Sequence, residues 1–251
     1  MIQNLMVSAS RSVATHFRSK PFTMQNRAPL VSFTFDDCPD SAFTHGASIL
    51  SDHGVYGTFY ISAGLCDTND TYWHVITPEQ VRALHDQGHE IGCHTFSHVN
   101  VETLSASRLD EECRMNHNLL RRLCGDIQLT NFCYPFGGIS LGRKLQLQQR
   151  FDTCRSAIEG VNVGTVDLAM LKAVELYDRT LTPEKLQNVL RETCDRNGWL
   201  IFYTHDVAEP PTFMGCSPGF LRKTIETVQS MGIACVPIRD ALRQIGYFPK
   251  T

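Results

Sequence analysis

The sequence predicts an α/β fold in which parallel strands form a barrel with helices on its outside. From Leu30 onward, short β-branched and aromatic runs alternate with segments that have helical patterns and caps. No repeat or low-complexity linker interrupts this alternation. Such alternation implies right-handed βαβ units, and about six or more of them suggest a barrel.

Each expected strand is a short apolar run that ends at a turn or at polar residues. The expected strands are 31–35, 55–62, 89–93, 131–134, 151–157, 199–204 and 233–236. The apolar segment 170–177 fits either a helix or a strand, because periodicity does not separate the two in short runs.

Capping residues and glycines set the expected helix boundaries. Thr77 can cap a helix that Pro78 begins, Gln80 completes a capping-box spacing, and Gly88 ends it. The other expected helices run from 42 to 53, from Ser105 to before Gly125, from 141 to 149, from Pro183 to Gly198, and from Pro218 to about Gly232.

Composition excludes several functional classes. The net charge of -3 gives no electrostatic reason to expect a nucleic-acid partner or an anionic membrane surface. No run approaches the roughly 20 apolar residues of a membrane span. We expect a weakly structured leader at 1–29 and a single catalytic domain at 30–251. Arg11, His16 and Arg18 interrupt the segment where the apolar core of a signal peptide would lie.

The ten cysteines have no Cys-x-x-Cys spacing, so a structural zinc site of cysteines is not expected. Four of them, Cys93, Cys133, Cys154 and Cys235, fall in expected strands, where a thiol behaves as a small buried hydrophobe. So many thiols would risk mispairing in an oxidising compartment, and we therefore expect a cytoplasmic protein.

Asp36 and Asp37 directly follow the first expected strand. Consecutive strand residues point to opposite faces, so the two carboxylates share a site only if the chain leaves the strand there, as Cys38-Pro39 suggests. The repulsion between two like charges this close is relieved by a cation or a shared proton. A metal bound by one carboxylate would leave the other free as a base. Stabilisation of a helix N-terminus is the alternative reading.

Two histidine motifs follow other expected strands. His94 and His98 are four residues apart, a spacing that in a helical turn puts both imidazoles on one face, as zinc pairs require. His205 ends the apolar run 199–204 and suits proton transfer because its pKa lies near neutral. A structural histidine bonded to Asp206 is the alternative for His205. One aspartate with two histidines is a plausible three-ligand zinc set.

The strand at 131–134 runs into a Pro/Gly turn that could aim a backbone N–H at a developing oxyanion. Tyr134 and Phe136 are the candidate residues of this turn, and a plain turn is an equally good interpretation. Trp73, in a polar loop, is a candidate sugar-stacking platform or a loop anchor.

These motifs resemble the polysaccharide deacetylases of carbohydrate esterase family four, over about 30–242. Thr34-Phe35-Asp36-Asp37, His94-Thr95-Phe96-Ser97-His98, Tyr134-Pro135-Phe136-Gly137 and Thr204-His205 are similar to four of that family's motifs. The resemblance implies the family's distorted (β/α) barrel with fewer than eight regular repeats. It also implies that Asp36 is the catalytic base, that Asp37, His94 and His98 bind the metal, and that His205 is the catalytic acid.

The sequence departs from the family pattern in three places. Cys38 replaces the glycine that normally ends the first motif, and Cys133 replaces the arginine that normally holds the catalytic aspartate. The aspartate–tryptophan pair of the fourth motif is missing. Arg155, near the end of the next expected strand, is our candidate to replace the missing arginine. Arg179 competes with it, and a surface position is the alternative for either.

The resulting expectation is N-deacetylation of an amino sugar in a poly- or oligosaccharide, with one divalent metal, preferably zinc, and a carbohydrate as the binding partner. Three alternatives stay open: the same mechanism on another amide, such as a formyl or cyclic amide; a barrel that binds metal and glycan without turnover; and a structural or partner-binding protein. The oligomeric state cannot be read from the sequence.

Overall fold

The computed structural model describes residues 10–249 and confirms the barrel. Seven parallel strands form it, fewer than the eight of a regular barrel. They are, in spatial order, β2 (Leu30–Phe35), β3 (Thr58–Ile61), β4 (Glu90–Cys93), β5 (Asn131–Cys133), β6 (Thr153–Glu159), β8 (Leu171–Glu175) and β9 (Trp199–Thr204). β9 pairs back onto β2 along its whole length and closes the barrel. The short β10 (Ala234–Cys235) pairs with the start of β2.

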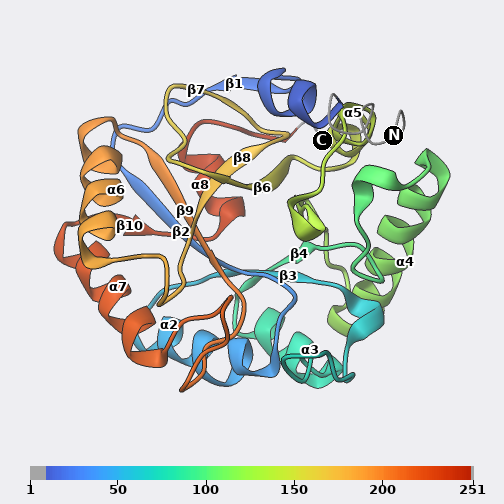
Figure 1. Cartoon of the computed structure of the whole chain (residues 1–251), viewed down its shortest axis with the longest axis horizontal. Helices are drawn as coiled ribbons and strands as arrows, with labels where there is room; N and C mark the ends of the chain where they lie inside the picture. Colours follow the sequence, from blue (N-terminus) through green and yellow to red (C-terminus); the bar gives the residue numbers. More distant parts are fainter. Residues whose placement is uncertain (1–9, 250–251) are drawn as a thin grey trace.

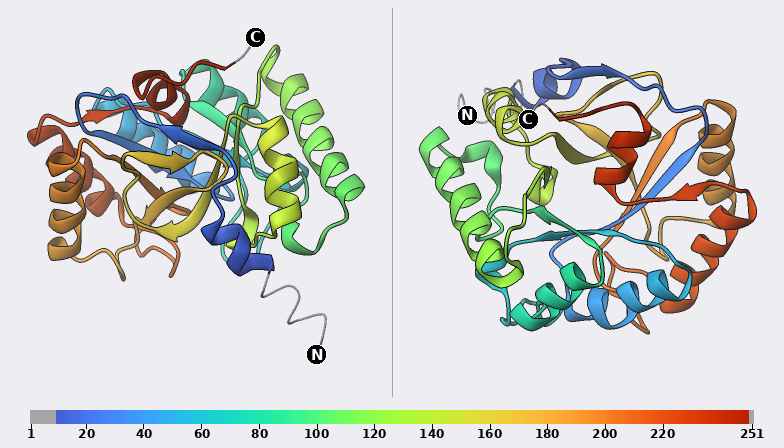
Figure 2. Two further views of the ribbon diagram at one scale, coloured as in Figure 1. Left: turned by 90° about the horizontal axis from the view of Figure 1, so that it is seen from above. Right: turned by 180° about the vertical axis from the view of Figure 1, so that it is seen from behind.

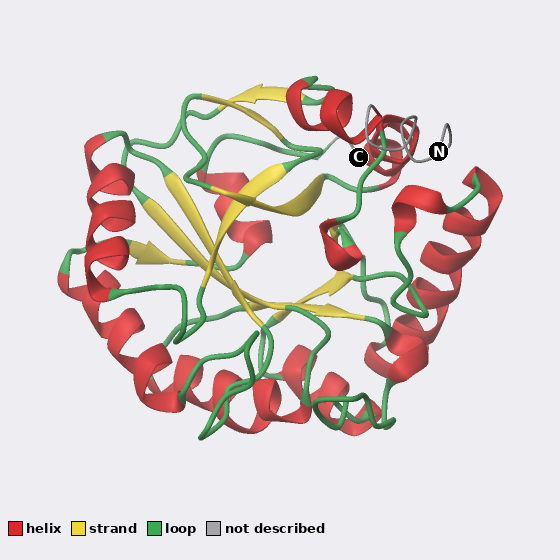
Figure 3. Cartoon of the chain, in the orientation of Figure 1, coloured by secondary structure: helices red, strands yellow, loops and turns green. Residues whose placement is uncertain are grey.

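The helices surround these strands (Figures 1 and 3). They are η1 (Ala42–Ala47), which is π-helical and runs into α2 (Ser48–Asp52), α3 (Pro78–Asp86), α4 (Ala106–Cys124), α5 (Leu141–Arg150), α6 (Pro183–Asp195) and α7 (Pro218–Ser230). The short 3-10 helices η2 (Ala63–Leu65), η3 (Val101–Thr103) and η4 (Pro135–Gly137) lie in the loops. No helix within 10–249 is long and apolar enough to span a membrane.

A further helix, α8 (Ile238–Gln244), lies over the N-terminal end of the barrel, as the rear view in Figure 2 shows. The backbone N–H of Ile238 donates to the Thr58 hydroxyl, and that of Arg239 donates to the Glu90 carboxylate. Since Thr58 and Glu90 begin β3 and β4, α8 covers this end of the barrel, opposite the end at which Asp36, His94 and His205 follow their strands.

The predicted capping box is present, and three other helices also begin at capping residues. Thr77 and Gln80 form the reciprocal capping box of α3. Ser105, Thr182 and Ser217 each accept a hydrogen bond from the first turn of α4, α6 and α7. An N-cap of this kind stabilises a helix by about 1 kcal/mol, so these residues contribute to fixing where the outer helices begin.

The two faces of β9 pack into different clusters. Leu200 and Phe202 belong to the larger core cluster, whereas Trp199, Ile201 and Tyr203 belong to a smaller one that includes residues of α8. The period of two along the strand produces this division. Because both faces are covered, the strand reads as a continuous apolar run in the sequence, as strands of buried parallel sheets do.

The expected leader at 1–29 is wrong for the part that the structure describes, 10–29. Residues 10–16 are helical, and β1 (Pro21–Thr23) pairs antiparallel with β7 (Thr165–Asp167). Ala14 is fully buried, and the Lys144 ammonium donates to the carbonyls of Ala14 and Phe17, both at 2.7 Å. These tertiary contacts order a segment too short to show a period of its own. Residues 1–9 lie outside the described residues.

Candidate metal and catalytic site

The backbone after β2 brings both aspartates into one site. Asp36 keeps the strand register, since its N–H donates to the Thr204 carbonyl of β9 at 2.9 Å. Asp37 and Cys38 then take left-handed conformations, with φ of 56° and 48°. This turn redirects the Asp37 side chain away from the face it would have in a strand. Left-handed non-glycine residues cost about 1 to 3 kcal/mol each and concentrate at functional sites.

The conformation of Cys38 accounts for the glycine that the family motif has there, because glycine adopts positive φ without steric cost. In this chain Cys38 is fully buried, and its thiol lies 3.4 Å from the Tyr60 carbonyl oxygen. The protein therefore keeps the turn geometry with a larger residue.

The structure brings Asp37, His94 and His98 together. Oδ1 of Asp37 lies 3.1 Å from Nε2 of His94 and 2.9 Å from Nε2 of His98. The three ligand atoms all lie within 4.8 Å of one another. The expected helical turn is wrong, however: residues 94–98 form an irregular loop in which Thr95 and His98 have φ of 62° and 49°. The two left-handed residues, not a helical period, direct both imidazoles to one point.

Buried partners hold this loop in place. The carboxylate of Glu112, on α4, accepts the backbone N–H groups of Phe96 and Ser97 at 3.0 and 2.9 Å. Nδ1 of His94 lies 2.9 Å from the Cys133 carbonyl oxygen. Because that contact requires a proton on Nδ1, it leaves the lone pair on Nε2 facing Asp37 and His98, an arrangement that suits a metal-binding histidine. The sequence patterns had not identified Glu112.

The donor set fits a divalent cation. Oδ1 of Asp37 is buried without a conventional hydrogen-bond partner, although it lies between two imidazole nitrogens. Burial raises the pKa of Asp37, but its close contacts with His94 and His98 and the charges of these imidazoles outweigh burial and hold the pKa well below its usual range. One carboxylate and two imidazoles are typical of a catalytic zinc site with open positions.

Arg155 contacts Asp36. Nη2 of its guanidinium reaches both carboxylate oxygens, and both side chains are buried. Burial raises the pKa of Asp36, but the charge of Arg155, followed by smaller effects of His94 and His205, outweighs it and lowers the pKa. Arg179 is exposed and donates to the Phe213 carbonyl instead, so it is not the partner of Asp36.

Asp36, His94 and Cys133 form a second group whose ligand atoms converge. This group is a poor cation site, because Nη2 of Arg155 already neutralises Asp36 and lies 2.7 Å from Sγ of Cys133. A cation there would face the guanidinium charge at close range.

His205 follows β9 and points its Nε2 towards the same centre, 3.8 Å from Oδ2 of Asp37. Its Nδ1 lies 3.1 Å from the Met214 carbonyl oxygen and 3.2 Å from the Tyr177 hydroxyl. Asp206 accepts hydrogen bonds from Thr212 instead, so the alternative of a His205–Asp206 bond does not hold. The Trp73 ring stacks on the His205 imidazole, with centroids 5.8 Å apart.

The turn after β5 contains the two candidate oxyanion donors, Tyr134 and Phe136, which differ in what their backbone N–H groups contact. The backbone N–H of Tyr134 donates to the Arg155 carbonyl at 3.2 Å, and its hydroxyl donates to the Ala169 carbonyl at 3.0 Å. Pro135 has no N–H. Phe136, with φ of 57°, is 70 % exposed, and its ring centroid lies 4.4 Å from that of His98. An oxyanion donor from this turn would therefore come from Phe136 and not from Tyr134.

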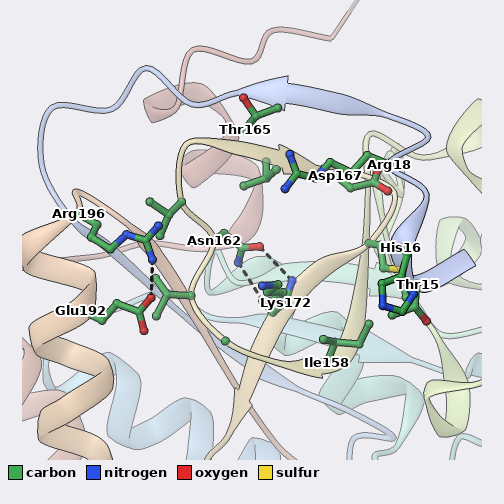
Figure 4. Close-up of a pocket in the computed structure, with 15 residues that line it drawn as sticks. Thr15, His16, Arg18, Ile158, Asn162, Thr165, Asp167, Lys172, Glu192 and Arg196 are labelled. Carbon is green, nitrogen blue, oxygen red and sulfur yellow. Dashed lines mark hydrogen bonds and ion pairs between the residues drawn. The ribbon is translucent and has the colours of Figure 1, made fainter. Parts of the chain in front are cut away.

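A cavity of about 550 Å³ lies elsewhere, between residues 15–18, the chain around β7 and α6. Figure 4 shows Arg18, Lys172 and Arg196 at its walls and the Asn162 side chain bonded to the backbone of Lys172. None of the predicted site residues lines this cavity.

Comparisons with curated proteins are consistent with this geometry. A chitin deacetylase from Colletotrichum lindemuthianum is 24 % identical over 233 residues, which cover 88 % of this chain and 83 % of that protein. A chitooligosaccharide deacetylase from Sinorhizobium fredii is 25 % identical over 44 % of this chain and 48 % of its own length.

Solved structures share the fold. A family 4 acetyl xylan esterase from Clostridium thermocellum, in complex with a cobalt ion, superposes with a TM-score of 0.63 at 22 % identity and covers 87 % of this chain and 93 % of its own. A mutant of a CE4 family pseudoenzyme gives a TM-score of 0.62 at 15 % identity, over 90 % of this chain and 71 % of its own. The polysaccharide deacetylase family model matches residues 23–151, just over half of the 251 residues. On this match, and with the barrel that these structures share, the chain belongs to the polysaccharide deacetylase family.

Proposed function

We propose that this protein is a metal-dependent hydrolase that removes the acetyl group from an N-acetylated amino sugar in a poly- or oligosaccharide. The observation that supports it most strongly is the convergence of Asp37, His94 and His98 on one point, with Asp36 and His205 beside it. Similarity to the chitin deacetylase over most of both chains supports the substrate class.

Each residue has a distinct role in this proposal. Asp37, His94 and His98 would hold the metal, which we propose to be zinc. When bound, such a cation polarises the acetamide carbonyl and lowers the pKa of a water molecule. Asp36, kept ionised by Arg155, accepts a proton from the attacking water.

The remaining groups act on the developing oxyanion and the leaving nitrogen. The Phe136 N–H donates to the developing oxyanion. His205 donates a proton from Nε2 to the leaving nitrogen. The balanced products are acetate and the free amino sugar.

Exposed aromatic side chains around the site favour a saccharide of several units. Phe136 stands beside His98. Beyond Trp73, the rings of Tyr72 and Phe213 pack edge to face with centroids 5.2 Å apart, and each is about half exposed. Aromatic faces with a few polar groups are typical of ligand sites. We therefore propose that rings on both sides of the centre contact neighbouring sugar units, which would give polymers and oligomers an advantage over a monosaccharide.

The test is acetate and amine release from chitin oligomers of increasing length, with and without a chelator. An O-acetylated xylan and an N-formylated sugar serve as competing substrates, because structural neighbours include an acetyl xylan esterase. We expect chelator-sensitive amine release from N-acetyl oligomers. Product release only from the xylan or the formyl substrate would show that the protein hydrolyses an acetyl ester or a formamide instead of an acetamide. Metal and oligosaccharide binding without any product would show a non-catalytic barrel.

The matched control is Asp36→Asn, which removes the proposed base and leaves the three metal-binding residues in place. Its turnover should fall by about 10²-fold or more, the usual contribution of general acid–base catalysis. Normal turnover in this variant would refute the role of Asp36.

A further inference from the structure

Three neighbours contact the imidazole of His205. Only one of them, the Met214 carbonyl, belongs to the loop that carries His205. Met214 and Tyr177 contact Nδ1, and the Trp73 ring covers one face. Tyr177 follows β8, the strand that pairs with β9, and it is 4 % exposed. Its ring lies against His205 with a centroid distance of 5.9 Å.

These contacts fix the tautomer. A backbone carbonyl can only accept a hydrogen bond, so the contact between Nδ1 and the Met214 oxygen requires a proton on Nδ1. The neutral imidazole then carries its lone pair on Nε2, which is the nitrogen nearer Asp37. Nε2 is therefore the nitrogen that faces the metal-binding centre, and the Tyr177 oxygen accepts a second branch of the Nδ1–H hydrogen bond.

We propose that Tyr177 is a positioning residue for His205. One acceptor is enough to set the tautomer, but a single hydrogen bond only partly restrains rotation of the ring about its bond to Cβ. A second acceptor, on the segment that follows β8, together with the stacked Trp73, restricts that rotation further and keeps Nε2 directed at the metal-binding centre. The inference rests on the proposed function, because positioning of Nε2 matters where His205 protonates a leaving amine.

The dependence on the leaving group separates this role from general structural support. An amine leaves an amide only after it is protonated, whereas a nitrophenolate leaves an aryl acetate without protonation. Loss of the Tyr177 hydroxyl should therefore slow amide hydrolysis and leave aryl ester hydrolysis largely intact. A loosened fold would slow both reactions.

The experiment compares Tyr177→Phe with Tyr203→Phe in the metal-loaded full chain. Tyr203→Phe is the matched control, because its ring also lies near His205 but its hydroxyl donates to Glu175. For Tyr177→Phe we expect kcat on a chitin oligomer to fall about tenfold with KM within twofold, part of the 10²–10⁴ that general acid–base catalysis contributes. Hydrolysis of p-nitrophenyl acetate should change by less than about threefold, and Tyr203→Phe should resemble wild type on both substrates.

Proton NMR of the metal-free protein gives a readout that does not depend on turnover. The Nδ1–H signal of His205, assigned with His205→Gln, should be sharp in wild type and broadened by exchange with water in Tyr177→Phe. Equal losses on the amide and the aryl ester, a kcat within twofold of wild type, or an unchanged Nδ1–H signal would each overturn the inference. A wild type that deacetylates nothing would refute the proposed function, while the NMR comparison would still decide the positioning.

Discussion

Replacement of Arg155 tests the buried ion pair that holds the proposed base. The side chains of Arg155 and Asp36 are 1 % and 8 % exposed. Removing one partner from such a pair leaves an uncompensated buried charge and costs about 3 to 5 kcal/mol of folding free energy. Replacing both by uncharged groups of similar size is often neutral. The structure therefore predicts strong non-additivity between the two positions.

The assay is urea unfolding of metal-free wild type, Arg155→Met, Asp36→Asn and the double variant. Arg155→Met should lose about 3 to 5 kcal/mol of unfolding free energy. The loss in the double variant should be smaller than the sum of the two single losses by at least about 2 kcal/mol. Arg179→Met is the control, since its arginine is exposed and should change stability by less than about 0.5 kcal/mol.

Turnover adds a functional criterion to the same variants. Folded Arg155→Met should lose most of its activity while binding metal, because Arg155 contacts Asp36 and not the three proposed ligands. Additive stabilities, with near-normal turnover in Arg155→Met, would refute the reasoning that Arg155 positions and charges Asp36.

Three further predictions concern metal, pH and redox state. His98→Ala should weaken divalent-metal binding by orders of magnitude whereas Asp36→Asn should retain it, and equal metal content in wild type and His98→Ala would contradict the ligand set. Burial, followed by the charge of Arg239, lowers the pKa of His89 to about 4 from 6.5, and its Nδ1 accepts the Gly57 N–H at 3.1 Å. The folded state thus resists protonation of His89, so the free energy of unfolding should be highest above pH 6.5 and fall by up to about 3 kcal/mol towards pH 4. In urea unfolding across this pH range, His89→Gln should show a weaker pH dependence than wild type. We also propose a reducing cytoplasm, in which all ten free thiols are titratable in denatured protein from cells, and several stable disulfides would be contrary to this.

The fold was predictable because its signals are local and repeated. Capping residues such as Thr77 and Ser105 mark helix starts, and continuous apolar runs such as 199–204 mark buried parallel strands. Topology then places the ends of those strands at one end of the barrel, where Asp36, His94 and His205 follow β2, β4 and β9. The alternation of strands and helices and the positions of the charged motifs therefore indicated the same end of the barrel.

Other features have no local signal. The three-residue strands β1 and β7 are too short for a period, and the helix at 10–16 depends on tertiary contacts with α5. The His94–His98 spacing predicted that the two imidazoles converge, but through the wrong conformation, because nothing in the sequence marks Thr95 and His98 as left-handed. Tyr177 reads as the end of an apolar run, and only the pairing of β8 with β9 brings its hydroxyl to His205.

The departure at Cys133 is explained by strand register. Cys133 and Arg155 are direct partners on the parallel strands β5 and β6, and such strands lie about 4.8 Å apart. An arginine at either position can therefore direct its guanidinium towards the same carboxylate. Both at once would not fit, because position 133 is buried and its Sγ already lies 2.7 Å from Nη2 of Arg155. A small residue at 133 is thus the steric complement of an arginine at 155. The missing motif arginine consequently does not argue against catalysis, since Asp36 retains a buried guanidinium partner from the neighbouring strand.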